Sequence, residues 1–307
     1  FMTAFPTLQR GETVGIFSPS SRTEKDGVEK GAEILRQAGY TVHIHPSSYN
    51  SEKSFAGKPE ERAQALMELW TDSTIKAVMC TRGGNGAADM LEYLDFNLMA
   101  TQPKVLLGFS DITSLLLAVN KFASTVTFHG PVVKGMAGGT HEHDVAQCFR
   151  LLSGMGNTIP LEGGTIAHPG RAEGRMIGGN LSLLVSMLGT GYEPDFQDSI
   201  LFLEDCDDEA SRFHRMAGQL YRASVFSQIK GLVLGQFTDI HETGKIPFEM
   251  TIAEIFESYL QRAKFAGPLV TGAPFGHGQR NITLPVGARV TLSAEGDLPG
   301  LILPPRP

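Results

Sequence analysis

Short apolar strands that alternate with helices fill roughly the first 135 residues, and this alternation constrains the fold more than any other feature of the chain. Strands are expected at 13–18, 40–45, 75–80 and 104–107, and helices at 24–38, 59–71, 87–93 and 114–122. Because parallel strands need crossover connections, usually helices, this order predicts a mainly parallel sheet in an α/β fold. Ligands of such sheets bind at the carboxyl ends of the strands.

The length of 307 residues allows two domains of ordinary size, and a hydrophobic content of 41% suffices for two cores without metal or disulfides. The alternation stops at a glycine-rich stretch, 131–139. We therefore expect an α/β domain over 1–140, a linker region over 141–170 and a second domain over 171–307. The second domain should be smaller, mixed and β-rich, because strands are expected at 199–203, 231–237, 268–271 and within 282–303.

Composition excludes several classes of partner. The net charge is -7 and no cluster of five or more Lys and Arg residues occurs, so a nucleic-acid partner is not expected. No apolar run reaches eighteen residues, and the first ten residues lack a signal-peptide pattern, which predicts a cytoplasmic protein without membrane contact. The three cysteines, Cys80, Cys148 and Cys206, form no C-x-x-C pair and are expected to be reduced and buried.

Ser110 lies in the segment GFSDIT, between an apolar strand and an apolar helix. At such a corner a serine hydroxyl is exposed beside the unpaired N–H groups that open the helix, which suits a nucleophile. The segment is not the G-x-S-x-G elbow, because Ile112 replaces the second glycine. By itself it fits a capped turn better than a catalytic centre, since Ser, Asp and Gly are ordinary turn residues.

A nucleophilic serine needs a base, usually a histidine that a carboxylate orients. His277 is the best candidate, because it follows an expected strand and is flanked by glycines that let the loop approach a cleft. His129 is a weaker rival with a structural explanation. His141 and His143 belong to the acidic segment HEHD, which we expect to be exposed and which lacks the further ligand that a metal site requires.

The orienting carboxylate is expected at the end of the strand 199–203. Glu204 follows this buried strand directly, where a charge is costly unless it is paired. The neighbouring Asp205, Asp207 and Asp208 also fit a solvated acidic turn. Position at the strand end favours Glu204 or Asp205 and leaves the choice between these two open.

The segment RGGNGA, residues 82–87, offers backbone N–H donors for the oxyanion of an acyl-transfer reaction. It follows a strand on the same sheet edge as the serine, and the N–H groups of Gly84 and Asp111 are the candidate pair. Glycine-rich turns also bind phosphates, but Asp89 occupies the position of the third glycine in G-x-G-x-x-G. A dinucleotide site is therefore not expected.

The segments RGGNG, GFSDIT, LFLED and FGHGQR, in this order and spacing, together resemble the LD-carboxypeptidase family of serine peptidases. The family includes cytoplasmic murein tetrapeptide carboxypeptidases and microcin C immunity peptidases. The resemblance implies a flavodoxin-like N-terminal domain, a swivelling β-rich C-terminal domain and an active site between them. It also implies a homodimer that uses no metal and no cofactor.

The same resemblance implies a catalytic triad. Ser110 would attack the amide carbonyl, His277 would act as base and then as acid, and Glu204 would fix the imidazole. The backbone N–H groups of Gly84 and Asp111 would hold the oxyanion.

The implied substrate is a small murein-derived peptide, cut between the L-centre of a diamino acid and a terminal D-alanine during cell-wall recycling. Arg82 is a candidate partner for the terminal carboxylate of the peptide, and a structural salt bridge would explain this residue equally well.

Two alternatives to murein cleavage remain. A microcin C-type peptidase would cleave a peptidyl-nucleotide or a related amide and would stack the base on an aromatic side chain. The only tryptophan, Trp70, is expected to be packed on a helix, while Tyr192, Phe196 or Phe213 could replace it. The more remote alternative is a non-catalytic protein that binds a ligand.

Overall fold

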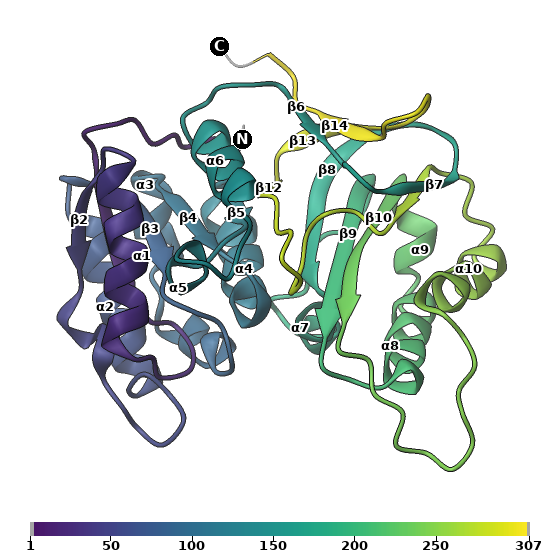
Figure 1. Cartoon of the computed structure of the whole chain (residues 1–307), viewed down its shortest axis with the longest axis horizontal. Coiled ribbons are helices and arrows are strands. Elements are labelled where there is room, and N and C mark those ends of the chain that lie inside the picture. The colour runs from purple at the N-terminus through teal and green to yellow at the C-terminus, as the bar shows by residue number, and fades with distance from the viewer. Residues whose placement is uncertain (1–2, 306–307) are drawn as a thin grey trace. The chain divides into compact units, whose positions relative to one another are not determined.

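The computed structural model describes residues 3–305 and divides into two compact units (Figure 1). The first unit holds the chain up to Gly156 and the segment Gln279–Ala288, and the second holds Asn157–Gly278 and the chain from Arg289 onward. These bounds differ from the expected ones. The segment 141–170, expected to be a linker, forms a helix and two strands. The helix forms because its apolar side is buried in the first unit.

The first unit is built on a six-stranded sheet of order β12-β5-β4-β3-β1-β2. All neighbouring strands are parallel except β12, which pairs antiparallel with β5, so the predicted mainly parallel sheet is confirmed. The strands are β1 (Thr13–Phe17), β2 (Thr41–Ile44), β3 (Ile75–Cys80), β4 (Val105–Gly108), β5 (Thr127–His129) and β12 (Leu284–Val286).

Helices connect these strands, and α1 and α5 lie together in front of the sheet in Figure 1. The Trp70 side chain is buried as expected, and its Nε1–H donates to the Met99 carbonyl at 3.2 Å. The α-helices are α1 (Lys25–Gln37), α2 (Pro59–Thr71), α3 (Phe96–Thr101), α4 (Thr113–Ala123), α5 (Val133–Met136) and α6 (Glu142–Leu152). The 3-10 helices are η1 (Pro46–Tyr49), η2 (Ala87–Tyr93) and η3 (Ser110–Ile112).

The second unit contains an eight-stranded mixed sheet of order β6-β14-β13-β8-β9-β10-β11-β7. Its central strands β8 to β11 are parallel and the outer pairings are antiparallel, which confirms the predicted mixed sheet. The strands are β6 (Thr158–Pro160), β7 (Thr165–His168), β8 (Gly170–Asn180), β9 (Ser199–Cys206), β10 (Gly231–Thr238), β11 (Leu269–Thr271), β13 (Arg289–Ala294) and β14 (Gly300–Ile302).

The helices of the second unit bury an aromatic core. Phe213 of α8 and Phe256 of α10 pack on Phe237 of β10, with ring centroids 5.3 and 6.0 Å apart. These helices are α7 (Leu181–Met187), α8 (Ala210–Arg222), α9 (Val225–Gln228) and α10 (Ile252–Arg262). Among residues 3–305, no helix has both the length and the hydropathy needed to cross a membrane.

Candidate active site

Ser110 sits on a sharp corner between β4 and α4. Its φ of 65° lies in the left-handed region, which residues other than glycine seldom occupy and which marks a strained turn. A Cβ on Gly108 would lie 2.8 Å from side-chain atoms of Ile112, so the buried Ile112 packs closely over this glycine. The chain thus forms a strand-to-helix corner that presents the serine although the second glycine of the common elbow is absent.

The glycine-rich segment Gly83–Ala87, here called the oxyanion loop, lies directly beside Ser110. A Cβ at Gly83 would be 3.0 Å from the Ser110 Cβ and 3.2 Å from its Oγ. Gly84 has a φ of 123°, and a Cβ there would collide with the hydroxyl of Ser21. Glycine suits both positions because the backbone approaches two serine side chains closely, and at Gly84 the positive φ adds to this preference.

Two N–H groups beside Ser110 have no acceptor within residues 3–305, namely those of Gly84 and Asp111. The other donors of the oxyanion loop are occupied: the Asn85 N–H donates to Ser21 Oγ at 3.1 Å, and the Ala87 N–H donates to the buried Asp111 carboxylate at 2.8 Å. Open N–H donors next to a serine hydroxyl meet the requirement of an oxyanion hole.

Glu204 and His277 form a hydrogen-bonded pair within the second unit. The His277 Nδ1–H donates to Glu204 Oε2 at 2.6 Å, and the Glu204 side chain is fully buried. The flanking glycines explain how the loop reaches β9: a Cβ on Gly276 would lie 3.1 Å from the Glu204 Cβ, and one on Gly278 would collide with Gln236. In a serine triad the carboxylate holds Nδ1–H and Nε2 is the atom that acts as base.

Burial and neighbouring charge set the protonation of this pair. Burial raises the pKa of the Glu204 carboxyl, although the hydrogen bond and charge of His277 oppose the shift. Burial lowers the pKa of His277, but hydrogen bonds with the side chains of Cys206 and Glu204 outweigh it and raise this pKa to about 10. The imidazole must therefore lose a proton before it can accept one from a nucleophile.

Asp205 serves another purpose. Its Oδ1 accepts from the Asn180 side chain at 2.9 Å, and its Oδ2 accepts from the Ser182 N–H at 2.9 Å and from the Ser182 hydroxyl. It thereby satisfies a donor in the first turn of α7. Side chains alternate along a strand, so Glu204 and Asp205 face opposite sides of β9, and Glu204 is the one that faces His277.

Cys206 was not among the residues expected to take part in a site. Cys80 and Cys148 are buried as predicted, but Cys206 is partly exposed, which corrects the expectation for this residue. It lies two residues after Glu204 in β9, and its side chain interacts with His277. The two-residue period of strands was the signal for this proximity, and it was missed because β9 was expected to end at residue 203.

The rival histidines occupy structural positions. The His129 ring is buried in β5 and packs edge-to-face on Phe109, with centroids 5.8 Å apart. His141 caps α6, since its Nδ1 accepts from the His143 N–H at 3.2 Å. Within the part of the chain that the structure describes, no group of three or more His, Cys, Asp or Glu side chains is placed to hold a metal ion.

The expectation of an exposed HEHD segment is wrong for Asp144, which is fully buried. The carboxylate accepts from Arg280 Nε at 3.0 Å and from the Asn281 N–H at 2.8 Å. These bonds to a guanidinium and a backbone amide offset the cost of burying its charge.

Arg82 is half-buried at the start of the glycine-rich segment. Its Nε–H donates to the Gly83 carbonyl at 3.2 Å and its Nη1 to the Arg22 carbonyl at 3.4 Å. No carboxylate among residues 3–305 forms an ion pair with it. The salt bridge considered as an alternative explanation is therefore not found within these residues.

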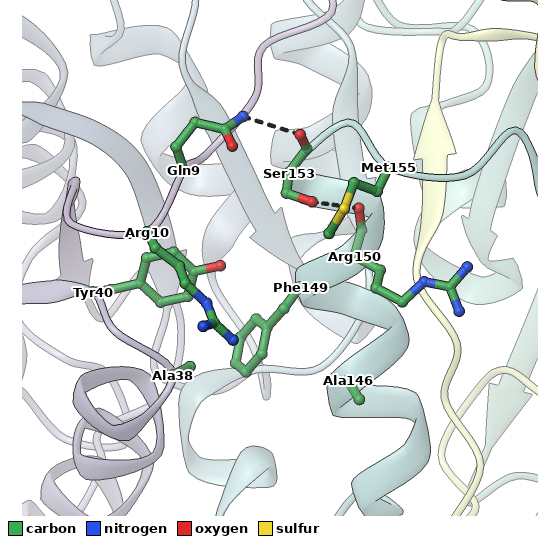
Figure 2. Close-up of a pocket in the computed structure, with 9 residues that line it drawn as sticks. All are labelled: Gln9, Arg10, Ala38, Tyr40, Ala146, Phe149, Arg150, Ser153 and Met155. Carbon is green, nitrogen blue, oxygen red and sulfur yellow. Dashed lines mark hydrogen bonds between the residues drawn. The ribbon is translucent and has the colours of Figure 1, made fainter.

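A cavity of about 550 Å³ lies elsewhere in the first unit (Figure 2). Tyr40 and Phe149 pack edge-to-face inside it, with centroids 5.5 Å apart. The cavity is lined by Gln9, Arg10, Ala38, Tyr40, Ala146, Phe149, Arg150, Ser153 and Met155. Its lining residues precede β1 and β2 or belong to α6 and the turn after it, whereas Ser110 follows the carboxyl end of β4. The cavity is thus at the other end of the sheet from the serine.

A serine on a strained strand-to-helix corner, together with a carboxylate–histidine pair, is typical of serine hydrolases. The profile of the LD-carboxypeptidase N-terminal domain matches residues 14–130, and that of the LD-carboxypeptidase C-terminal domain matches residues 173–292. The chain belongs to the LD-carboxypeptidase family, and it is a hydrolase of the carboxypeptidase class.

Similar proteins agree with this assignment. The chain is 32% identical over 292 residues to "Probable murein peptide carboxypeptidase" of Bacillus subtilis (strain 168), covering 93% of this chain and 90% of the relative. It is also 32% identical over 292 residues to "Murein tetrapeptide carboxypeptidase" of Pseudomonas aeruginosa, covering 91% and 92%. The fold is similar to that of MccF in complex with glutamyl sulfamoyl guanosine, with a TM-score of 0.88 at 22% identity and 98% coverage of both chains.

Proposed function

We propose that this protein is a serine LD-carboxypeptidase that removes the terminal D-alanine from murein-derived peptides. The hydrogen bond of 2.6 Å between His277 and the buried Glu204 carries the proposal, because it prepares an imidazole to activate a serine. The strained Ser110 and the two relatives named for murein peptides support the same conclusion. Cell-wall recycling in the cytoplasm, by a homodimer, belongs to this proposal.

In the proposed reaction the Ser110 Oγ attacks the carbonyl carbon of the scissile amide while the His277 Nε2 takes the hydroxyl proton. The Glu204 carboxylate stabilises the resulting imidazolium. The carbonyl electron pair moves onto oxygen, where the N–H groups of Gly84 and Asp111 hold it. The pair then returns, the C–N bond breaks, and His277 gives its proton to the leaving D-alanine nitrogen. Water hydrolyses the acyl-enzyme by the same steps.

Arg82 is proposed to bind the terminal carboxylate of the substrate. A carboxypeptidase must recognise that carboxylate, and a guanidinium can do so with two parallel hydrogen bonds. Its position next to the oxyanion loop and the lack of an ion-pair partner within residues 3–305 support this role.

The direct test is incubation of the protein with L-Ala-γ-D-Glu-meso-diaminopimelate-D-Ala, followed by detection of free D-alanine. The wild type should release D-alanine and Ser110→Ala should not. The same peptide ending in L-alanine serves as the stereochemical control and should stay intact. Release at the wild-type rate by Ser110→Ala would reject the mechanism.

A second candidate is cleavage of a peptidyl-nucleotide, because the fold is similar to that of MccF, whose structure holds glutamyl sulfamoyl guanosine. Of the three aromatic residues considered for stacking a base, Phe196 and Phe213 are buried, and only Tyr192 is partly exposed. This favours murein peptides. Faster hydrolysis of glutamyl sulfamoyl guanosine than of the tetrapeptide would favour the peptidyl-nucleotide as substrate. Hydrolysis of neither compound would favour a protein that only binds a ligand.

A further inference from the structure

Arg62 carries a charge inside the first unit. It lies on α2 with 2% of its surface exposed, and none of the carboxylates in residues 3–305 forms an ion pair with it. Its Nη1 instead donates to two backbone carbonyls, that of Pro19 and that of Gly86, the latter at 2.7 Å. A buried guanidinium is costly, so its retention at this place calls for an explanation beyond the stability of the fold.

Arg62, Phe55 and Gly86 are tightly packed against one another. The Arg62 guanidinium lies over the Phe55 ring, 5.6 Å from its centroid. A Cβ on Gly86 would be 2.9 Å from Phe55 Cδ1 and 3.1 Å from Arg62 Nη1, and Gly86 has a left-handed φ of 107°. The carbonyl of a conformationally free residue is therefore held by a cation that is itself packed on an aromatic ring.

The same loop carries two further anchors, at Asn85 and Ala87. Ser21 holds the Asn85 N–H at 3.1 Å and Asp111 holds the Ala87 N–H at 2.8 Å. With Arg62 on Gly86, three consecutive residues of the oxyanion loop are each fixed by a different side chain. The other end of the loop, at Gly83, lies against Ser110.

We propose that Arg62 is a positioning residue that holds the oxyanion loop so that the Gly84 N–H points at the carbonyl oxygen under attack. Three glycines in five residues leave the loop many conformations, and a fixed Gly86 carbonyl removes most of them. Both bonds come from Nη1, whose two N–H groups have fixed directions in the guanidinium plane, whereas the lysine ammonium is a flexible point charge and reproduces this geometry only in part. This inference rests on the proposed hydrolase function.

The expected signature is a loss of kcat with little change in KM. Charge on the carbonyl oxygen develops in the transition state, so misplacing its donor penalises the transition state more than substrate binding. Losing one oxyanion donor outright lowers kcat roughly 10²- to 10³-fold, so misplacing it in Arg62→Met should lower kcat by about tenfold or more. Arg62→Lys should retain more activity than Arg62→Met, and guanidinium chloride at low millimolar concentration should partly restore Arg62→Ala.

Lys104 provides the matched control, because it is also a buried cation that donates to backbone carbonyls. It binds the carbonyls of Leu69, Asp72 and Ile75 around the far end of α2. Lys104→Met should lower the melting temperature as Arg62→Met does, yet leave kcat unchanged. Equal loss of kcat in both variants would reduce Arg62 to a stabilising residue and overturn the proposal.

Amide hydrogen exchange separates this inference from the proposed function. In Arg62→Met, residues 83–87 should exchange faster than in wild type, while β3 and β4 keep their protection. Unchanged exchange at 83–87, or a uniform increase over the first unit, would overturn the positioning role. A wild type that releases no D-alanine would refute the proposed function, and the exchange measurement would still decide what Arg62 holds. If Arg62→Met does not fold, Arg62→Lys undergoes the same comparison.

Discussion

Glu204 and Asp205 are neighbours in β9, yet only the Glu204 carboxylate is hydrogen-bonded to His277. Glu204 accepts from His277, while Asp205 accepts from Asn180 and Ser182 at the start of α7. The alternation of side chains along the strand separates the two roles. The first carboxylate is the one we propose for catalysis and the second stabilises the start of α7, so substitution should distinguish them.

Glu204→Gln should impair catalysis, and Asp205→Ala should impair stability. The comparable change in a Ser-His-Asp triad lowers kcat about 10⁴-fold because the imidazole takes the wrong tautomer, so we expect a loss of 10³-fold or more. Asp205→Ala should instead cost about 1–3 kcal/mol of unfolding free energy, since it leaves buried donors without an acceptor. D-alanine release and urea unfolding of both variants check the prediction, and a larger kcat loss in Asp205→Ala would contradict it.

Activity should rise with pH well beyond neutrality. As the proposed base, His277 must be deprotonated to accept a proton. Burial lowers its pKa, but hydrogen bonds with Cys206 and Glu204 outweigh burial and raise this pKa to about 10. Each pH unit below that value should therefore lower kcat/KM about tenfold. The measurement is a profile of kcat/KM from pH 6 to 11, and a plateau that begins at pH 6 would contradict the assignment.

Cys206→Ala should move this profile toward lower pH. The thiol is one of the groups that raise the pKa of His277, so removing it should leave more neutral imidazole at pH 7. The expected result is an ascending limb shifted to lower pH at an unchanged plateau. A profile that coincides with that of the wild type would show that Cys206 does not influence the imidazole.

Alanine substitution in the oxyanion loop should separate crowding from backbone strain. Gly84→Ala introduces both, because φ is 123° and the new Cβ meets Ser21, whereas Gly11→Ala introduces strain alone, with φ at 88° and nothing within 4 Å. A left-handed alanine costs about 1–2 kcal/mol, so both variants should lose at least this stability. Only Gly84→Ala should lose D-alanine release, and a similar loss in Gly11→Ala would contradict the placement of the loop at the site.

Arg82→Gln should raise KM for the tetrapeptide with little effect on kcat. Hydrogen bonds to a charged group contribute about 1.5–3 kcal/mol, which corresponds to roughly a 10- to 100-fold rise. A tetrapeptide with an amidated terminus serves as control. It should bind the wild type poorly, and Arg82→Gln should not weaken its binding further. If Arg82→Gln weakens both peptides equally, the residue does not bind the terminal carboxylate.

The local sequence pattern was sufficient to predict many of the helices and strands. Helix α2 and strand β3 have the bounds that the sequence predicts, because Pro59 suits the first turn of a helix and the apolar run 75–80 suits a buried strand. The corner at Ser110 followed from the same kind of signal. Strand β8 could not be predicted from such signals, because its glycines and charged residues are typical of loops. It forms because Gly178 lets it approach Phe202 of β9 closely.

The sequence alone therefore determined the mainly parallel sheet, the serine at the end of one of its strands and the residue types that a hydrolase requires. Tertiary structure decided which of two adjacent carboxylates meets His277, 73 residues away, and which side chains hold the oxyanion loop. The physical reason is that local conformation depends on neighbours in the chain, whereas the partner of a buried charge depends on strand register and on close approach of distant segments. Arg62 and Asp144 are the clearest cases, because each is a charged residue whose burial only its distant partners explain.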